Sequence, residues 1–335
     1  MHIPNPVFHP TFNITRTSHV VMTVRDLAAS KHFYTELIGL IVTEENSDTV
    51  YLRGLEEACH HSLVLKKWNG TPECLRIGMR MFTDDDLVKA EAWYKAQGLP
   101  TKWVEVPHQG RTLHTTDKSG VPLEFCATMT VVPRLVTAVR LFKGGCAHRL
   151  DHYQILTHDV QGACDFYMSQ GFRMSEYIVA DHVEEMAGIF LQRKGNPHDI
   201  VFFTGEGPRL HHFAYTSIDV GTLIRACDTA GSLGMGGIVE RGPGRHGPGH
   251  AQYVYFRDPD GHRCELFTTH YQIMDIECEP IRWDKNSPMR KEIWGYPPVQ
   301  SWVEDASPFA GLALKPPILK ESGMTLEKFL AARAK

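Results

Sequence analysis

Two histidine positions and one glutamate in the second half of the chain have the residue types of a metal site. His152 opens one predicted strand, the pair His211-His212 opens a second, and Glu265 lies in a third. Two neutral imidazoles and one carboxylate cover one face of an octahedral ion and leave three positions open, which suits non-haem Fe(II) and oxygen chemistry. Side chains alternate along a strand, so only one of His211 and His212 can join such a site. Alternation alone leaves both candidates open.

Other classes of function fit the sequence less well. Zinc hydrolases also use two histidines and a carboxylate, but the chain has no H-E-x-x-H motif. Lys and Arg total 35 against 39 Asp and Glu, without a basic stripe, which argues against a nucleic-acid partner. Apolar runs are shorter than the ~20 residues of a membrane span, so no membrane partner is expected. Eight scattered cysteines and an N-terminus unlike a signal peptide favour a reduced cytoplasm.

An internal repeat organises the chain. Residues 17–45 and 150–178 share the order strand, Asp-initiated helix, glycine and strand, at an offset of 133 residues. The aspartates are expected to be helix N-caps, and the glycines are expected to end the helices. The matched positions are His19 and His152, Asp26 and Asp159, Phe33-Tyr34 and Phe166-Tyr167, and Gly39 and Gly171.

The remaining pattern predicts a pair of βαβββ units in each half, and therefore an α+β fold. The last strand of the second half follows the turn Asp258-Pro259-Asp260-Gly261. Its other predicted elements are strands near 174–180, 186–194, 199–204, 210–216, 236–241 and 251–256, with a helix near 220–231. The predicted domains are an arm at 1–14, an N-terminal domain at 15–130, a connector at 131–147, a catalytic domain at 148–272, and a tail at 273–335 that covers the active site and ends in a helix at 325–334.

The N-terminal copy keeps only part of the ligand set. His19 and Glu124 stand at the places of its first and last strands, but the strand at 74–82 contains no histidine. We therefore expect this half to lack a metal and to serve as scaffold and interface.

Six blocks of sequence make the comparison with a known family specific. The chain resembles the type I extradiol catechol dioxygenases of the vicinal oxygen chelate superfamily from about Thr17 to Trp302, most of all the branch that acts on homoprotocatechuate (3,4-dihydroxyphenylacetate). The blocks are YLRGLEEACHHSLVL (51–65), RLDHY (149–153), GPRLHHFAY (207–215), ERGPGRHGPG (240–249), YFRDPDGHRCELFT (255–268) and WGYPPVQSW (294–302).

The resemblance implies a fold, a metal and an assembly. It implies glyoxalase-like modules that form two open β-barrel domains, and a homo-oligomer, either a dimer or a tetramer. It makes His152, His212 and Glu265 the ligands of Fe(II), with His211 as the neighbour that does not bind. Mn(II) is the alternative ion, because it accepts the same ligands.

The resemblance also assigns residues to the reaction. It makes His198 an acid–base catalyst beside dioxygen, where the residues alone allow an exposed turn histidine. It makes Tyr255 a hydrogen-bond partner of a substrate oxygen, with Tyr253 as the alternative. His246 is expected to touch the ligands of the metal, with His250 as the alternative.

The remaining candidates concern the substrate. Arg241 and Lys291 could hold a substrate carboxylate, or they could be solvated surface charges, and Trp302 is expected to wall the pocket. Lys291 stands where the family has arginine. Lysine keeps the positive charge but loses the two-pronged hydrogen-bonding geometry of arginine. Gln154 stands where asparagine is expected. Both departures bear on the identity of the substrate.

The resemblance implies that O2 cleaves the ring of a small aromatic diol at a bond beside the two hydroxyl groups. Ring opening would give a muconic semialdehyde. One rival is a non-oxidative metal enzyme of the same superfamily, such as an isomerase, lyase or thiol transferase. Another is a metal-free binding protein of this fold, which would leave a buried Glu265 without a cation.

Overall fold

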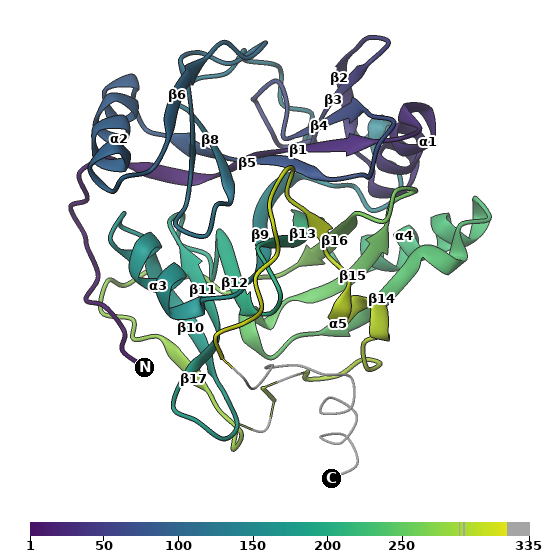
Figure 1. The fold of residues 1–335 in the computed structure, drawn as a ribbon. Coiled ribbons are helices and arrows are strands. Elements are labelled where there is room, and N and C mark those ends of the chain that lie inside the picture. Colours follow the sequence, from purple (N-terminus) through teal and green to yellow (C-terminus); the bar gives the residue numbers. More distant parts are fainter. Residues whose placement is uncertain (288, 291, 320–335) are drawn as a thin grey trace.

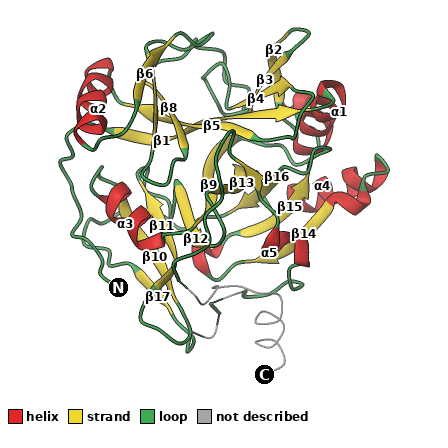
Figure 2. Cartoon of the chain, in the orientation of Figure 1, coloured by secondary structure: helices red, strands yellow, loops and turns green. Residues whose placement is uncertain are grey.

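Two mixed β-sheets, one above the other in Figure 1, make up the body of the protein. The computed structural model describes residues 1–287, 289–290 and 292–319. The sheet order is β2-β3-β4-β1-β5-β8-β7-β6 in the first half and β14-β15-β16-β13-β9-β12-β11-β10-β17 in the second. Neither path closes on itself, and few helices flank the sheets (Figure 2), so the expected α+β fold of open sheets is confirmed.

The first sheet is followed by a short connecting helix. Its strands are β1 (Ile14–Val24), β2 (Ile41–Glu45), β3 (Thr49–Arg53), β4 (Leu63–Lys67), β5 (Cys74–Met81), β6 (Thr101–Val104), β7 (Thr112–Thr116) and β8 (Pro122–Cys126). Its helices are α1 (Leu27–His32), the π-helix η1 (Phe33–Ile38) and α2 (Asp84–Ala96), and the 3-10 helix η2 (Val139–Leu141) lies in the connector.

The second sheet repeats this order and adds strands from the tail. Its strands are β9 (Arg149–Thr157), β10 (Arg173–Val179), β11 (Met186–Gln192), β12 (Ile200–Thr204), β13 (Arg209–Thr216), β14 (Val239–Arg245), β15 (Gln252–Arg257), β16 (Arg263–Thr268), β17 (Ile281–Trp283) and β18 (Ser307–Pro308). Its helices are α3 (Val160–Met168), α4 (Val220–Ser232), η3 (Gly236–Ile238), η4 (Pro248–His250) and α5 (Gln300–Glu304). None of the described helices is long and apolar enough to cross a bilayer.

The helix caps expected from the repeat are present. Asp26 accepts hydrogen bonds from the amides of residues 28 and 29, and Asp159 accepts one from the amide of Gly162. Gly39 and Gly171 follow the helices with φ of 87° and 86°, in the left-handed region that glycine adopts at little cost. The predictions from the two aspartates and two glycines are confirmed.

Two expectations differ from the structure or fall outside it. The strand predicted near 236–241 begins only at Val239, because Gly236–Ile238 forms a 3-10 turn. The diglycine 236–237 has no side chains to pack on a sheet, and pairing starts at the first β-branched residue after Ile238. The helix predicted at 325–334 lies outside the described residues. The predicted domain boundaries remain predictions.

Tyrosines from the two helices cross between the halves. The hydroxyl of Tyr34, in η1, donates to Asp258 in the turn before β16, at 3.0 Å. The hydroxyl of Tyr167, in α3, donates to Asp117 in the turn before β8, at 3.2 Å. All four side chains are buried, so each half holds the last turn of the other.

Candidate metal centre and substrate pocket

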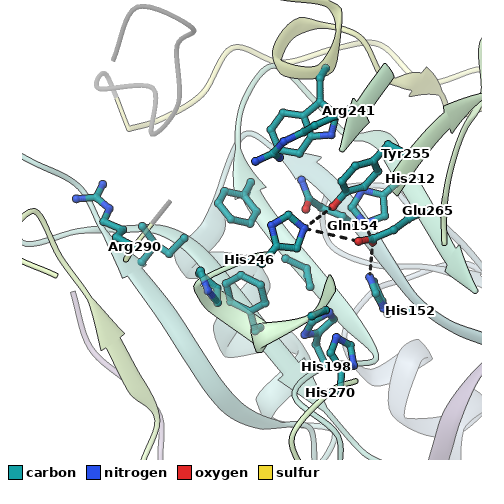
Figure 3. Close-up of a pocket in the computed structure, with 17 residues that line it drawn as sticks. His152, Gln154, His198, His212, Arg241, His246, Tyr255, Glu265, His270 and Arg290 are labelled. Atoms are coloured by element: carbon teal, nitrogen blue, oxygen red, sulfur yellow. Dashed lines mark hydrogen bonds and ion pairs between the residues drawn. The ribbon is translucent and has the colours of Figure 1, made fainter. Parts of the chain in front are cut away.

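The three predicted ligands lie on adjacent strands of the second sheet. His152 of β9 and Glu265 of β16 both stand level with Ala214 of β13, and His212 lies two residues before Ala214 on the same face. The Nε2 atoms of His152 and His212 lie 3.2 and 3.1 Å from Oε2 of Glu265, and all three side chains are buried (Figure 3). The sheet therefore brings together the set predicted from the sequence.

A β-bulge changes the relation between His211 and His212. Register shifts between Leu210 and His212, so the two imidazoles do not diverge as strict alternation requires. Their Nδ1 atoms lie 2.7 Å apart, and Nε2 of His211 is 2.8 Å from the carbonyl oxygen of Trp302. His212 lines the pocket, whereas His211 lies behind it.

This arrangement fixes the protonation of His212. The Trp302 carbonyl can only accept, so Nε2 of His211 carries the proton. Burial, together with Arg263, holds the pKa of His211 well below its usual value, so the ring is neutral and its Nδ1 is an acceptor. Nδ1 of His212 must then donate, which leaves the Nε2 that faces Glu265 without a proton.

His152 reaches the same state by another route. Its Nδ1 donates to the carboxylate of Asp151 at 3.0 Å, so Nε2 is the nitrogen left without a proton when the ring is neutral, as a metal ligand must be. Two nitrogen lone pairs and a carboxylate oxygen thus face one another in a buried space. Such atoms repel unless a cation lies between them, and the three candidate ligand atoms lie within 4.8 Å of one another. These residues therefore fit a divalent metal ion.

The electrostatics agree with this fit. Burial alone would raise the pKa of Glu265, but the neighbouring imidazoles of His152, His212 and His246 hold it well below its usual value. Burial lowers the pKa of His212 to about 4. The pKa of His152 is raised, because Asp151 and Glu265 outweigh the effect of burial. The two histidines differ in direction because His152 lies beside two carboxylates, Asp151 and Glu265, whereas burial dominates at His212, which has Glu265 alone.

The predicted substrate-side residues gather around one pocket of about 640 Å³. Tyr255 of β15 stands opposite Glu265, and its hydroxyl lies 2.9 Å from Nε2 of His246. Lys291 lies outside the described residues. The pocket is lined by His152, Gln154, Ile178, Phe190, His198, Val201, Phe203, His212, Arg241, His246, Pro248, Ala251, Tyr255, Glu265, His270, Arg290 and Trp302.

His198 is buried rather than an exposed turn histidine. Its ring meets that of His152 edge to face, at 4.3 Å between centroids, and its Nδ1 makes no hydrogen bond with the described protein atoms. Burial and the neighbouring His152 and His270 hold its pKa well below the usual value. His198 also lines the pocket, where a neutral imidazole can exchange a proton with a bound group.

Sequence reasoning missed His270, Arg290 and Glu292. His270 packs on His198 and Phe267, and it follows Thr269, whose φ is 70°. A β-branched residue in that region is strained, which indicates that the chain is bent to aim His270 inward. No sequence pattern marks this position, because His270 follows its strand like any loop residue.

Comparison with known proteins fits this geometry. A family model described as the Glyoxalase/Bleomycin resistance protein/Dioxygenase superfamily matches residues 16–125 and again residues 149–266. The chain belongs to this superfamily. Two matches in one chain also agree with the internal repeat found in the sequence.

Its relatives narrow the assignment within the superfamily. The manganese-dependent 2,3-dihydroxybiphenyl 1,2-dioxygenase of Geobacillus genomosp. 3 is 30% identical over 300 residues, or 85% of this chain and 94% of the relative. The metapyrocatechase of Geobacillus stearothermophilus is 24% identical over 308 residues, or 85% and 90%.

Solved structures agree. An extradiol ring-cleaving dioxygenase from B. fuscum superposes with a TM-score of 0.89 at 35% identity, over 96% of this chain and 91% of that one. The complex of homoprotocatechuate 2,3-dioxygenase from Brevibacterium fuscum with 3,4-dihydroxyphenylacetate gives 0.86 at 37%, over 91% and 96%. The resemblance to extradiol dioxygenases predicted from the sequence is confirmed.

Proposed function

We propose that the protein opens the ring of a catechol beside its diol, adding both atoms of O2 and giving a muconic semialdehyde. His152, His212 and Glu265 hold one divalent metal for this reaction. The observation that carries the proposal is the pair of unprotonated Nε2 atoms aimed at a buried carboxylate. Fe(II) and Mn(II) both suit this set, and a relative named as manganese-dependent supports keeping both.

A metal held by His152, His212 and Glu265 would activate the diol and dioxygen and bring them together, which would remove much of the entropic barrier to their reaction. The protein residues orient the diol and manage its protons. Burial and the charge of Glu265 hold the pKa of Tyr255 well above its usual value, so its hydroxyl stays protonated and donates to a substrate oxygen. His246, 2.9 Å from that hydroxyl, keeps it aimed.

His198 is the proposed acid–base group. It is neutral and buried, and Phe190 packs against its other side at 5.3 Å between ring centroids. Such a ring can take the proton that leaves the diol and return it as the ring opens. Apolar side chains, among them Ile178, Phe190, Val201 and Phe203, line the same pocket together with the buried Gln154 and Trp302.

The first test is metal content and oxygen uptake. Protein loaded anaerobically with Fe(II) or Mn(II) should hold one ion per chain and, after catechol and air are added, should consume one O2 per ring cleaved with a yellow product. No oxygen uptake with catechol, 2,3-dihydroxybiphenyl or 3,4-dihydroxyphenylacetate would refute dioxygenase activity. Bound metal with an isomerase, lyase or thiol-transferase activity instead would favour the non-oxidative rival.

We also infer a cytoplasmic homo-oligomer, a dimer or a tetramer, from the family resemblance. Light scattering on the purified protein measures the mass of the particle, and a monomer would contradict this assembly.

A further inference from the structure

The guanidinium of Arg241 is already paired inside the pocket. Its Nη2 lies 2.5 Å from Oε2 of Glu292, and only 2% and 6% of the two side chains are exposed. Arg241 had been expected from the sequence to bind a substrate carboxylate or to be a solvated charge. In the structure it faces a carboxylate of its own chain.

Further contacts fix this pair in place. Tyr253 donates its hydroxyl to Glu292, and the ring of Tyr253 stacks on His246 at 3.8 Å with an angle of 9° between planes. The guanidinium lies 3.9 Å from the centre of the Trp302 ring. Glu292 therefore contacts Arg241 and Tyr253, with Nδ1 of His246 3.8 Å from its Oε1, and moving it away from Arg241 would disturb these contacts.

A second guanidinium at the pocket is paired as well. Arg290 is buried and forms an ion pair with Asp181. The other lining residues on this side are apolar or aromatic: Ile178, Phe190, Val201, Phe203, Pro248 and Ala251. Among the described lining residues, each arginine thus already has an acidic partner, and the surface beside them suits an uncharged group.

An anionic substituent would meet a physical obstacle here. It would share Arg241 with Glu292, which brings two negative charges together in a buried space, or it would displace Glu292 and strand that carboxylate without its cation. An uncharged substituent meets neither penalty and can pack on the Trp302 ring or accept a hydrogen bond.

We propose that Glu292 determines specificity by occupying Arg241, so that the enzyme selects catechols with an uncharged ring substituent and discriminates against those bearing a carboxylate. This rests on the proposed ring-cleaving function. This preference for an uncharged substrate is the reverse of the expectation that Arg241 binds an acidic substrate.

Two substrates of nearly equal shape test it: 3,4-dihydroxyphenylacetate and its amide, 3,4-dihydroxyphenylacetamide. Metal-loaded protein should show kcat/KM at least about tenfold higher for the amide, mainly through KM, since a like charge beside Glu292 weakens binding of the acid. Glu292→Gln should raise the acid-to-amide ratio at least about tenfold. Glu292→Asp keeps the charge and should keep the wild-type preference.

Asp305→Asn is the matched control. It removes one carboxylate from an exposed pair with Arg257, outside the pocket, and should leave the ratio unchanged. Wild-type preference for the acid, or equal effects of Glu292→Gln on both compounds, would overturn the inference while leaving ring cleavage intact. Anaerobic calorimetry of both compounds on the metal-loaded protein gives the same contrast in Kd. If the protein turns over no catechol at all, the proposed function is refuted. The ratio of the Kd values for the acid and the amide would still decide the role of Glu292.

Discussion

Each half of the protein buries one glutamate at an equivalent place in its sheet, Glu124 in the first half and Glu265 in the second. The groups that compensate the negative charge differ between the two halves. In the first half, Nε2 of His19 and of His114 each lie 2.6 Å from an oxygen of Glu124. In the second half, the corresponding contacts of Glu265 with His152 and His212 are longer, at 3.2 and 3.1 Å. The short contacts are hydrogen bonds that close the first site, whereas the longer ones join atoms that need a cation between them.

One position explains much of the difference. Gly78 stands level with Glu124 as Ala214 does with Glu265, so Arg76 occupies the place of His212. Arg76 is half-buried; burial lowers the pKa of its guanidinium, and the charge of Glu124 offsets part of that effect. A permanent cation of the protein therefore stands where the second half offers a nitrogen lone pair.

A second position sets the proton on the first histidine. Ser18 and Asp151 are equivalent in the repeat. The Ser18 hydroxyl lies 3.1 Å from Nδ1 of His19 and can donate to it, which leaves Nε2–H to donate to Glu124. Asp151 can only accept, so it turns the proton of His152 away from Glu265. The residue that is hydrogen-bonded to Nδ1 of each histidine therefore decides whether its Nε2 donates a hydrogen bond or is free to bind a metal.

The largest predicted effect comes from His212→Arg, which copies Arg76 into the second half. The chain should fold, because the guanidinium neutralises Glu265, but it should lose its metal. Since a metal ion contributes several kcal/mol to the transition state, activity should fall by more than about a thousandfold. Metal analysis, circular dichroism and oxygen uptake measure these outcomes, with exposed His250→Asn as control. One bound ion per chain in His212→Arg would show that the comparison is wrong.

Asp151→Ser should have the next largest effect, since it copies Ser18. The hydroxyl would favour a proton on Nε2 of His152 and weaken metal binding about 10- to 100-fold, as loss of an orienting partner commonly does. Competition with a chelator of known affinity measures the change. Unaltered affinity would mean that Asp151 does not set the tautomer.

Glu124→Gln tests the first half. Removing the negative charge weakens the buried hydrogen bonds that His19, His114 and Gln109 make with this side chain, so unfolding free energy should fall by about 1–3 kcal/mol. Metal content and kcat should not change, because no ligand is touched. Denaturant unfolding, metal analysis and steady-state kinetics on the same preparation separate the two effects. A change in metal content would assign a metal to the first half.

The smallest predicted effect is a pH dependence at one of the crossing contacts. Burial raises the pKa of Asp117 from 3.8 to about 6. Between these values the folded state binds more protons than the unfolded state, so this group's contribution to stability is greatest below pH 4 and falls as pH rises to 6. The total change is about 2–3 kcal/mol. Unfolding free energy plotted against pH from 4 to 7 should fall more steeply for the wild type than for Asp117→Asn. Parallel plots for the two proteins would contradict the prediction.

Much of the scaffold was predictable from the sequence because it depends on local rules. Asp26 and Asp159 cap helices, Gly39 and Gly171 end them, and the repeat places first and last strands alike. These features need only backbone geometry, which neighbouring residues determine.

The site was less predictable, because its decisive contacts join distant segments. The alternation of side chains along a strand did not decide whether His211 or His212 is the ligand, and only the family resemblance chose between them. The bulge at this place has no recognisable sequence pattern. Glu292 reaches Arg241 across 51 positions, and no periodic pattern foretells that contact. The roles of Ser18 and Asp151 depended on ring orientations that residue types do not specify.

The crossing tyrosines make the two halves mutually dependent. Tyr34 holds the turn that leads into β16, the strand of Glu265, so a strand that carries a predicted metal ligand is anchored by a side chain of the other half. Tyr167 anchors the turn before β8 in return, so neither repeat has all the buried hydrogen-bond partners of its own last turn. A change in one half can therefore alter the site in the other half without touching any residue of that site.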